Sequence, residues 1–112
     1  MKRDYSLFLK DIISAIDSIQ LFVGGITLDD LANDDKTSSA VIRKFEIIGE
    51  ATKHVPEELK EKHPDIPWKT MSGMRDRLIH AYFGIDYKLV WNIIRDELPG
   101  LKRKLQSILK DI

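Results

Sequence analysis

The sequence predicts an all-α protein, a compact up-and-down bundle of about four to six helices. Apolar residues recur at steps of three and four along most of the chain, which is the spacing of one helix face. No segment alternates apolar and polar residues in the way that a half-buried strand does. The length of 112 residues fits one domain, residues 1–112, because domains usually contain about 100 to 200 residues.

The composition excludes several classes of protein. Eighteen basic and eighteen acidic residues cancel, so the chain is neither a histone-like polycation nor an acidic tail. The chain has no cysteine, which removes disulfides, thiolate nucleophiles and Cys-containing metal sites and fits a reducing compartment, so we expect a cytoplasmic protein. We expect no signal peptide, and no membrane span because no stretch approaches the ~20 apolar residues that one needs.

Three helices are expected in the first half of the chain. Residues 5–23 form an amphipathic helix that stops at Gly24-Gly25, and Thr27 is an N-cap candidate for a short helix from Leu28. A long helix from about Lys36 to Val55 ends before Pro56, and Gly49 in its middle predicts a close approach by another helix. The residues expected to face the core are Tyr5, Phe8, Leu9, Ile12, Ile16, Ile19, Val23, Val41, Phe45, Ile48, Thr52 and Val55.

The second half contains more helix-breaking residues. A short helix over 56–62 and a loop over 63–68 precede a helix that begins at Ser72 or Gly73 and continues to residue 83. Gly84 is expected to close that helix, and Asp86 to cap the next one, which Pro99 breaks or kinks. The last helix is expected to bury Leu101, Leu105, Ile108 and Ile112.

The segment 74–83 combines charged and apolar residues in an unusual way. At about 100° per residue, Arg75 lies in the middle of an apolar face, and Tyr82 falls on the same line two turns later. Asp76 and His80 are four residues apart, so the carboxylate is expected to hold one imidazole nitrogen and orient the ring. Arg77 is expected to point to solvent.

An arginine on an apolar face requires a partner, and two interpretations follow. The first is an internal ion pair with Glu46 or Glu50. The second is a phosphate-binding cleft, in which Arg75 grips the phosphate as a bidentate fork and His80 moves protons near pH 7. Together these two residues suit RNA cleavage through attack of the neighbouring 2'-hydroxyl, without a metal ion.

Other catalytic patterns are weak. The three histidines do not form the i, i+4 pair of a zinc helix, and the sequence has neither a phosphate-cradling Gly-rich loop nor a G-x-S-x-G elbow. We therefore expect no metal site and no cofactor. The basic run Lys102-Arg103-Lys104 fits a solvated helix face better than an RNA track.

The spacing Arg75, four residues, His80, one residue, Tyr82 resembles the R-x4-H-x-Y motif of the HepT-like ribonuclease toxins, a branch of the HEPN superfamily. The similarity extends over nearly the whole chain. It includes the segments Ile47-Ile48-Gly49-Glu50-Ala51, Ile66-Pro67-Trp68, Gly73-Met74-Arg75-Asp76 and Phe83-Gly84-Ile85-Asp86.

The resemblance implies a helical bundle that forms a homodimer, with Arg75 and His80 of both subunits in a shared cleft. It implies a metal-independent endoribonuclease, the toxin of a type VII toxin–antitoxin system. The implied antitoxin is a minimal nucleotidyltransferase that adenylylates the motif tyrosine, Tyr82. Because relatives were earlier described as nucleotidyltransferase substrate-binding partners, a non-catalytic binding subunit is the alternative function.

Overall fold

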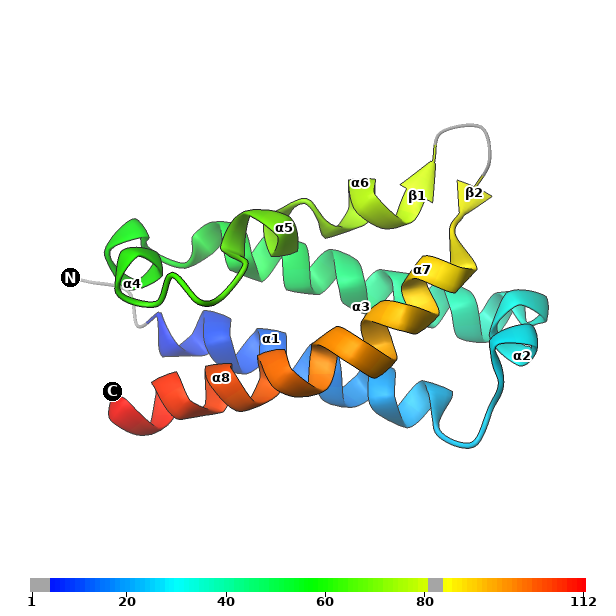
Figure 1. Cartoon of the computed structure of the whole chain (residues 1–112), viewed down its shortest axis with the longest axis horizontal. Helices are drawn as coiled ribbons and strands as arrows, with labels where there is room; N and C mark the ends of the chain where they lie inside the picture. Colours follow the sequence, from blue (N-terminus) through cyan, green and yellow to red (C-terminus); the bar gives the residue numbers. More distant parts are fainter. Residues whose placement is uncertain (1–4, 81–83) are drawn as a thin grey trace.

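The computed structural model describes residues 5–80 and 84–112, and its chain runs back and forth in four passes (Figure 1). The passes are formed by α1 (Ser6–Val23), by α3 (Asp35–His54), by α5 (Trp68–Ser72) with α6 (Met74–Leu78), and by α7 (Tyr87–Asn92) with η1 (Ile93–Glu97) and α8 (Leu98–Asp111). Between passes lie α2 (Leu28–Asn33), α4 (Glu57–Lys62) and the two-residue strands β1 (Ile79–His80) and β2 (Gly84–Ile85). The predicted all-α bundle is confirmed, with more short elements at its turns than the periodicity indicates.

The core lies between α1, α3, the third pass (α5 and α6) and the fourth pass (α7, η1 and α8). The predicted inward residues of α3 are buried, among them Thr52, whose hydroxyl donates to the Ile48 carbonyl oxygen at 2.6 Å. Trp68 is also buried, and its indole N–H donates to the His63 carbonyl oxygen at 2.9 Å. Ile112, which is predicted to face the core, is 57% exposed because α8 ends at Asp111. Three other predicted core residues, Tyr5, Phe8 and Val23, are only partly buried and pack against the core from its edge.

Side-chain caps set the starts of two helices in the first half. Thr27 and Asp30 form a reciprocal capping box at the start of α2, as the N-cap prediction requires. Asp34 caps α3 by accepting from the backbone N–H groups of Lys36 and Thr37. Hydrogen bonds from the Thr37 hydroxyl and then from these N–H groups lower the pKa of the Asp34 carboxyl.

The predicted helix over residues 72–83 is wrong. Two short helices, α5 and α6, meet near Gly73, and α6 ends at Leu78, before His80. The residue at position 83 lies outside the described residues. An apolar spacing of three and four is compatible with a helix locally, but the pairing of β1 with β2 overrides that preference.

The antiparallel pair β1–β2 replaces the end of the predicted helix. Ile79 lies opposite Ile85 and His80 opposite Gly84, and the β-branched pair favours extended backbone. Gly84 has a φ of +73°, a conformation that residues with a side chain rarely adopt. The glycine therefore begins the second strand of a hairpin rather than ending a helix.

Pro99 acts on the helix before it. The five residues of η1 form a π-helix, and the Leu98 N–H donates to the Ile93 carbonyl oxygen five residues earlier. A proline has no N–H and its ring clashes with the carbonyl group four residues back, so the wider turn accommodates it. The predicted break at Pro99 thus takes the form of a π turn.

Within the described residues, no helix combines the length and the apolar character needed to cross a membrane.

Candidate active site around Arg75 and His80

Arg75 begins on α6 and reaches α3. Its Nε lies 3.3 Å from Oε2 of Glu46, which is one of the two partners predicted for an internal ion pair. Glu50, the other, pairs instead with Lys53 at 3.2 Å. The predicted placement of Arg75 in the middle of an apolar face is wrong: its side chain is 62% exposed, because α6 is short and buries Met74 and Leu78 instead.

A polar groove of about 460 Å³ separates α3 from the junction of α5 and α6. Its floor includes Gly49, where a Cβ would lie 3.3 Å from the Ser72 carbonyl oxygen, so the predicted close approach is confirmed. Three basic and three acidic side chains line the groove, namely Arg43, Lys53, Arg75, Glu46, Glu50 and Asp76. The groove therefore has the size and the basic groups to accept an anion, and it carries carboxylates that compete for them.

His80 lies on β1 and has a different partner from the one expected. Its side chain is 51% exposed, and its Nε2 lies 3.7 Å from Oδ2 of Asp86. The predicted pair with Asp76 is wrong, because α6 ends before His80 and the four-residue helical spacing is lost. Asp76 lines the polar groove with Arg75.

Sequence reasoning missed Asp86 as the neighbour of His80. The sequence predicts Asp86 only as an N-cap, and it does cap α7, since its Oδ1 accepts from the Leu89 N–H at 3.1 Å. The signal that could have revealed the second role is Gly84, whose positive φ suits the start of a second strand better than the end of a helix.

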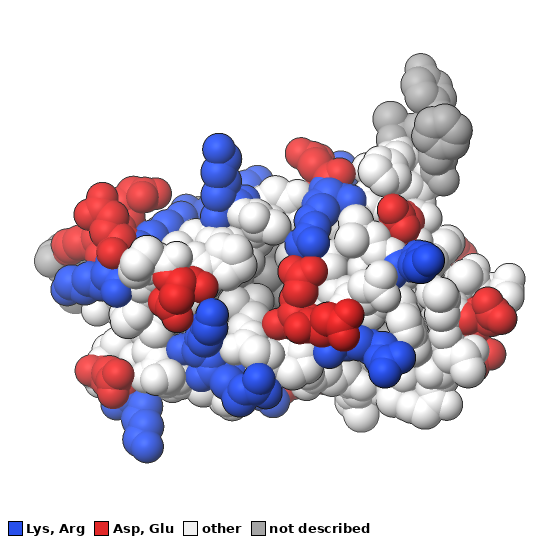
Figure 2. Space-filling model, in the orientation of Figure 1, with Lys and Arg blue, Asp and Glu red and all other residues white. Residues whose placement is uncertain are grey.

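The helical spacing predicts that Arg77 points to solvent, but the side chain is only partly exposed and has a partner. Its two terminal nitrogens donate to the two carboxylate oxygens of Glu97 at 3.1 and 3.0 Å. The pair connects α6 to η1. The molecular face in Figure 2 shows basic and acidic side chains interspersed, in keeping with the equal numbers of the two charges.

Tyr82, the third residue of the motif, lies outside the described residues, together with Ala81 and Phe83. Among the residues that the structure does describe, no three His, Asp or Glu side chains are grouped so that they could hold a metal ion. Arg75 and His80 are thus placed on consecutive elements, each beside a carboxylate from another part of the chain.

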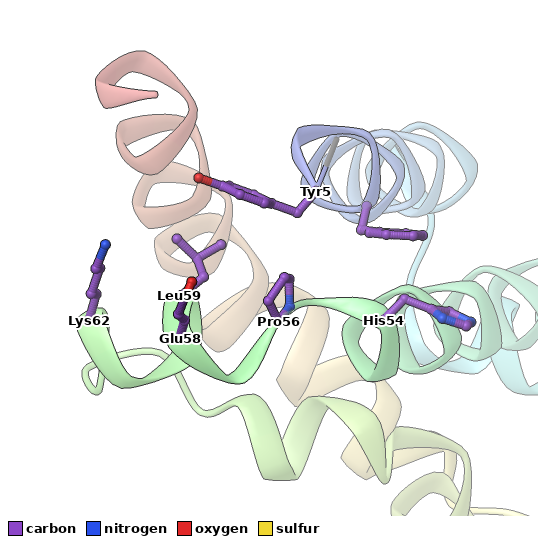
Figure 3. A pocket seen from close by; sticks show the side chains of 7 residues that line it. Tyr5, His54, Pro56, Glu58, Leu59 and Lys62 are labelled. Carbon is purple, nitrogen blue, oxygen red and sulfur yellow. The ribbon is translucent and has the colours of Figure 1, made fainter. Parts of the chain in front are cut away.

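A second hollow, of about 360 Å³, lies at the other end of the bundle, where the start of α1 meets α4 (Figure 3). Tyr5, His54, Pro56 and Leu59 are among its lining residues, and the His54 ring stacks on Phe8 with the ring centres 5.2 Å apart. Neither Arg75 nor His80 contributes to this hollow. It is therefore separate from the motif.

Comparison with known proteins places the chain among ribonucleases. The family described as "Ribonuclease HepT-like" matches residues 12–108. The "Probable ribonuclease HepT" of Thermococcus cleftensis is 46% identical over 110 residues, which cover 98% of this chain and 100% of that protein.

Further relatives agree with this assignment. Two proteins of Methanocaldococcus jannaschii, "Putative RNase MJ0125" and "Putative RNase MJ0127", are 44% and 43% identical over 111 residues. These alignments cover 99% of this chain and 96% and 92% of the two relatives, respectively. No solved structure matches the chain. The chain belongs to the HepT-like ribonuclease family.

Proposed function

We propose that the protein is a metal-independent endoribonuclease in which Arg75 and His80 are the catalytic residues. The observation that carries the proposal is that both motif side chains are more than half exposed, in a chain that belongs to this family. Arg75 adjoins a groove large enough for a phosphate group. The relatives named as ribonucleases supply the substrate class, RNA.

The reaction that suits these residues is an internal transesterification. The 2'-oxygen attacks the adjacent phosphorus, the bond to the 5'-oxygen breaks, and the products carry a 2',3'-cyclic phosphate and a 5'-hydroxyl. His80 takes the proton of the 2'-hydroxyl, while Arg75 binds the phosphate oxygens as their charge increases. We also propose that the protein acts as a homodimer, in which the protonated His80 of the second subunit gives a proton to the leaving 5'-oxygen.

The cellular role that we propose is that of a cytoplasmic toxin in a type VII toxin–antitoxin system. Its antitoxin is a minimal nucleotidyltransferase, which transfers AMP from ATP to the phenol oxygen of Tyr82 with release of pyrophosphate. Tyr82 completes the R-x4-H-x-Y spacing in the sequence. An added AMP brings a bulky group and a negative phosphate, both of which would exclude RNA from the arginine.

The experiment that tests the activity is RNA cleavage by the purified protein in the presence of a chelator. We expect cleavage with cyclic phosphate ends, and a loss of about 10² to 10⁴-fold for His80→Ala, the usual contribution of a positioned acid–base group. Activity that disappears with the chelator and returns with magnesium would contradict metal independence. A folded His80→Ala variant with wild-type cleavage would contradict the role of His80.

A separate experiment tests regulation. Co-expression with a nucleotidyltransferase encoded beside this gene should add AMP to the peptide that contains Tyr82, as seen by mass spectrometry. Tyr82→Phe should retain cleavage and escape neutralisation, because the phenol oxygen is the acceptor. AMP on another peptide, or neutralisation of the Phe variant, would refute the proposed acceptor.

The alternative is a non-catalytic subunit that presents a helical surface to a nucleotidyltransferase. The observation in its favour is that Glu46 and Asp86 already serve as partners of Arg75 and His80, as expected for structural ion pairs. The cleavage assay separates the two functions, since the binding subunit would form the complex without cutting RNA.

A further inference from the structure

The carboxylate of Asp86 is held in place by the start of a helix. Its Oδ1 accepts from the Leu89 N–H at 3.1 Å, as the cap of α7, and this bond restricts rotation of the side chain. Its other oxygen, Oδ2, is the one that lies 3.7 Å from Nε2 of His80. One carboxylate therefore faces both a helix terminus and the imidazole.

The hairpin explains why these two residues meet. His80 pairs with Gly84, and the Asp86 N–H donates to the Leu78 carbonyl oxygen at 2.9 Å, which extends the ladder by one pair. Residues 80 and 86 are thus diagonal neighbours on one face of the ribbon, a separation that long side chains can span. Gly84, directly opposite His80, has no side chain to intervene.

The alternative partner, Asp76, belongs to a different surface. It lines the polar groove between α3 and α6, whereas His80 is on the strand that follows α6. Asp86, which follows β2, takes the place beside His80 that the helical spacing predicts for Asp76.

We propose that Asp86 is a positioning residue for His80, and that its negative charge, 3.7 Å from Nε2, favours the proton on Nε2, so that Nδ1 is the nitrogen that accepts the proton of the 2'-hydroxyl. The part that concerns catalysis rests on the proposed function. A carboxylate on one ring nitrogen selects the tautomer and the ring orientation, and the other nitrogen is then the base. Asp86 acts through His80 and does not itself touch the RNA.

The test compares Asp86→Asn with the wild-type chain. Asparagine is as good an N-cap as aspartate, so α7 should be retained, whereas the negative charge that favours Nε2–H is lost. We expect nitrogen NMR of the neutral His80 ring to show mainly the Nε2–H tautomer in the wild type and a mixture in Asp86→Asn. Cleavage by the variant should fall roughly 10- to 100-fold, as part of the contribution of acid–base catalysis, and the fall should be in kcat rather than in KM.

Two matched variants serve as controls. Asp34→Asn makes the same change at the N-cap of another helix, and Asp76→Asn makes it at the partner that the sequence spacing predicts. Neither should alter the tautomer of His80. A response to Asp76→Asn equal to that of Asp86→Asn would show a general charge effect and would overturn the assignment.

The two measurements separate this inference from the proposed function. If the wild-type chain does not cleave RNA, the proposed function fails, and the role of Asp86 in catalysis fails with it, while the NMR result still decides whether Asp86 holds the ring. If the wild type cleaves RNA, an unchanged tautomer in Asp86→Asn overturns the inference alone. A changed tautomer with wild-type kcat also overturns it, because the ring would then need no positioning.

Discussion

Arg75 and Arg77 lie two residues apart on α6 and serve two different regions of the molecule. Arg77 faces η1 and gives both terminal nitrogens to Glu97, with its side chain only 31% exposed. Arg75 faces the groove beside α3, and its ion pair with Glu46 uses Nε. Within the part of the chain that the structure describes, the terminal nitrogens of Arg75 have no hydrogen-bond partner.

The difference shows how one residue type can serve structure or chemistry depending on what its guanidinium fork contacts. A fork matched to a carboxylate has its donors satisfied, so Arg77 joins the third pass of the bundle to the fourth. A guanidinium whose terminal N–H groups have no carboxylate partner can bind a phosphate in the same bidentate manner. The sequence pattern marks both arginines, but the contacts distinguish the structural one from the one available to a substrate.

The largest expected effect is on the rate of RNA cleavage, which should fall for a variant of Arg75 and not for the same variant of Arg77. Arg75→Lys keeps the charge but loses the planar fork, so cleavage should fall by about 10²-fold, as for the loss of one transition-state donor. Arg77→Lys should cleave RNA at close to the wild-type rate. Initial rates on one RNA substrate at equal concentrations of folded protein provide the measurement. Equal losses in the two variants would remove the distinction.

Stability should show the opposite ranking. Arg77→Ala should lower the free energy of unfolding by about 1 kcal/mol, since a bidentate, partly buried pair lies at the upper end for surface ion pairs. Arg75→Ala should lower it by less than about 0.5 kcal/mol, because its pair is single and exposed. Urea unfolding, with a double-mutant cycle between Arg77 and Glu97, measures these terms. A coupling energy near zero in that cycle would show that the fork contributes nothing.

The smallest expected effect is on RNA affinity and concerns Glu46, the carboxylate that pairs with Arg75. Glu46→Gln removes the competing charge, and binding of a 2'-O-methyl RNA, which cannot be cleaved, should tighten by up to about fivefold, the equivalent of an exposed ion pair. Glu50→Gln is the matched control, because it removes a charge from the same groove but from the pair with Lys53. Fluorescence titration at fixed salt compares them. Equal tightening in both variants would indicate a general charge effect rather than release of Arg75.

The sequence was a good guide to the long helices and a poor one to the motif segment. In α1, α3 and α8 the apolar period continues over several turns, so the face toward the core is well defined, and caps such as Thr27 are local features that require no knowledge of the fold. In residues 74–80 the same period covers too few turns to distinguish a helix that continues from one that ends. The hairpin also depends on a partner strand that the period does not reveal.

The sequence alone determined the all-α class, the helix faces, the glycine at a close helix approach and the motif that places the chain in its family. These depend on residue spacing and on local backbone preference. Only the tertiary structure decided that His80 faces Asp86, that Arg75 pairs with Glu46 and that Arg77 pairs with Glu97. The Arg75 and Arg77 pairs join residues 20 or more positions apart in the chain, and the pair of His80 with Asp86 crosses a hairpin turn. Their formation depends on where α6 ends and how the passes pack, which the helical period does not specify.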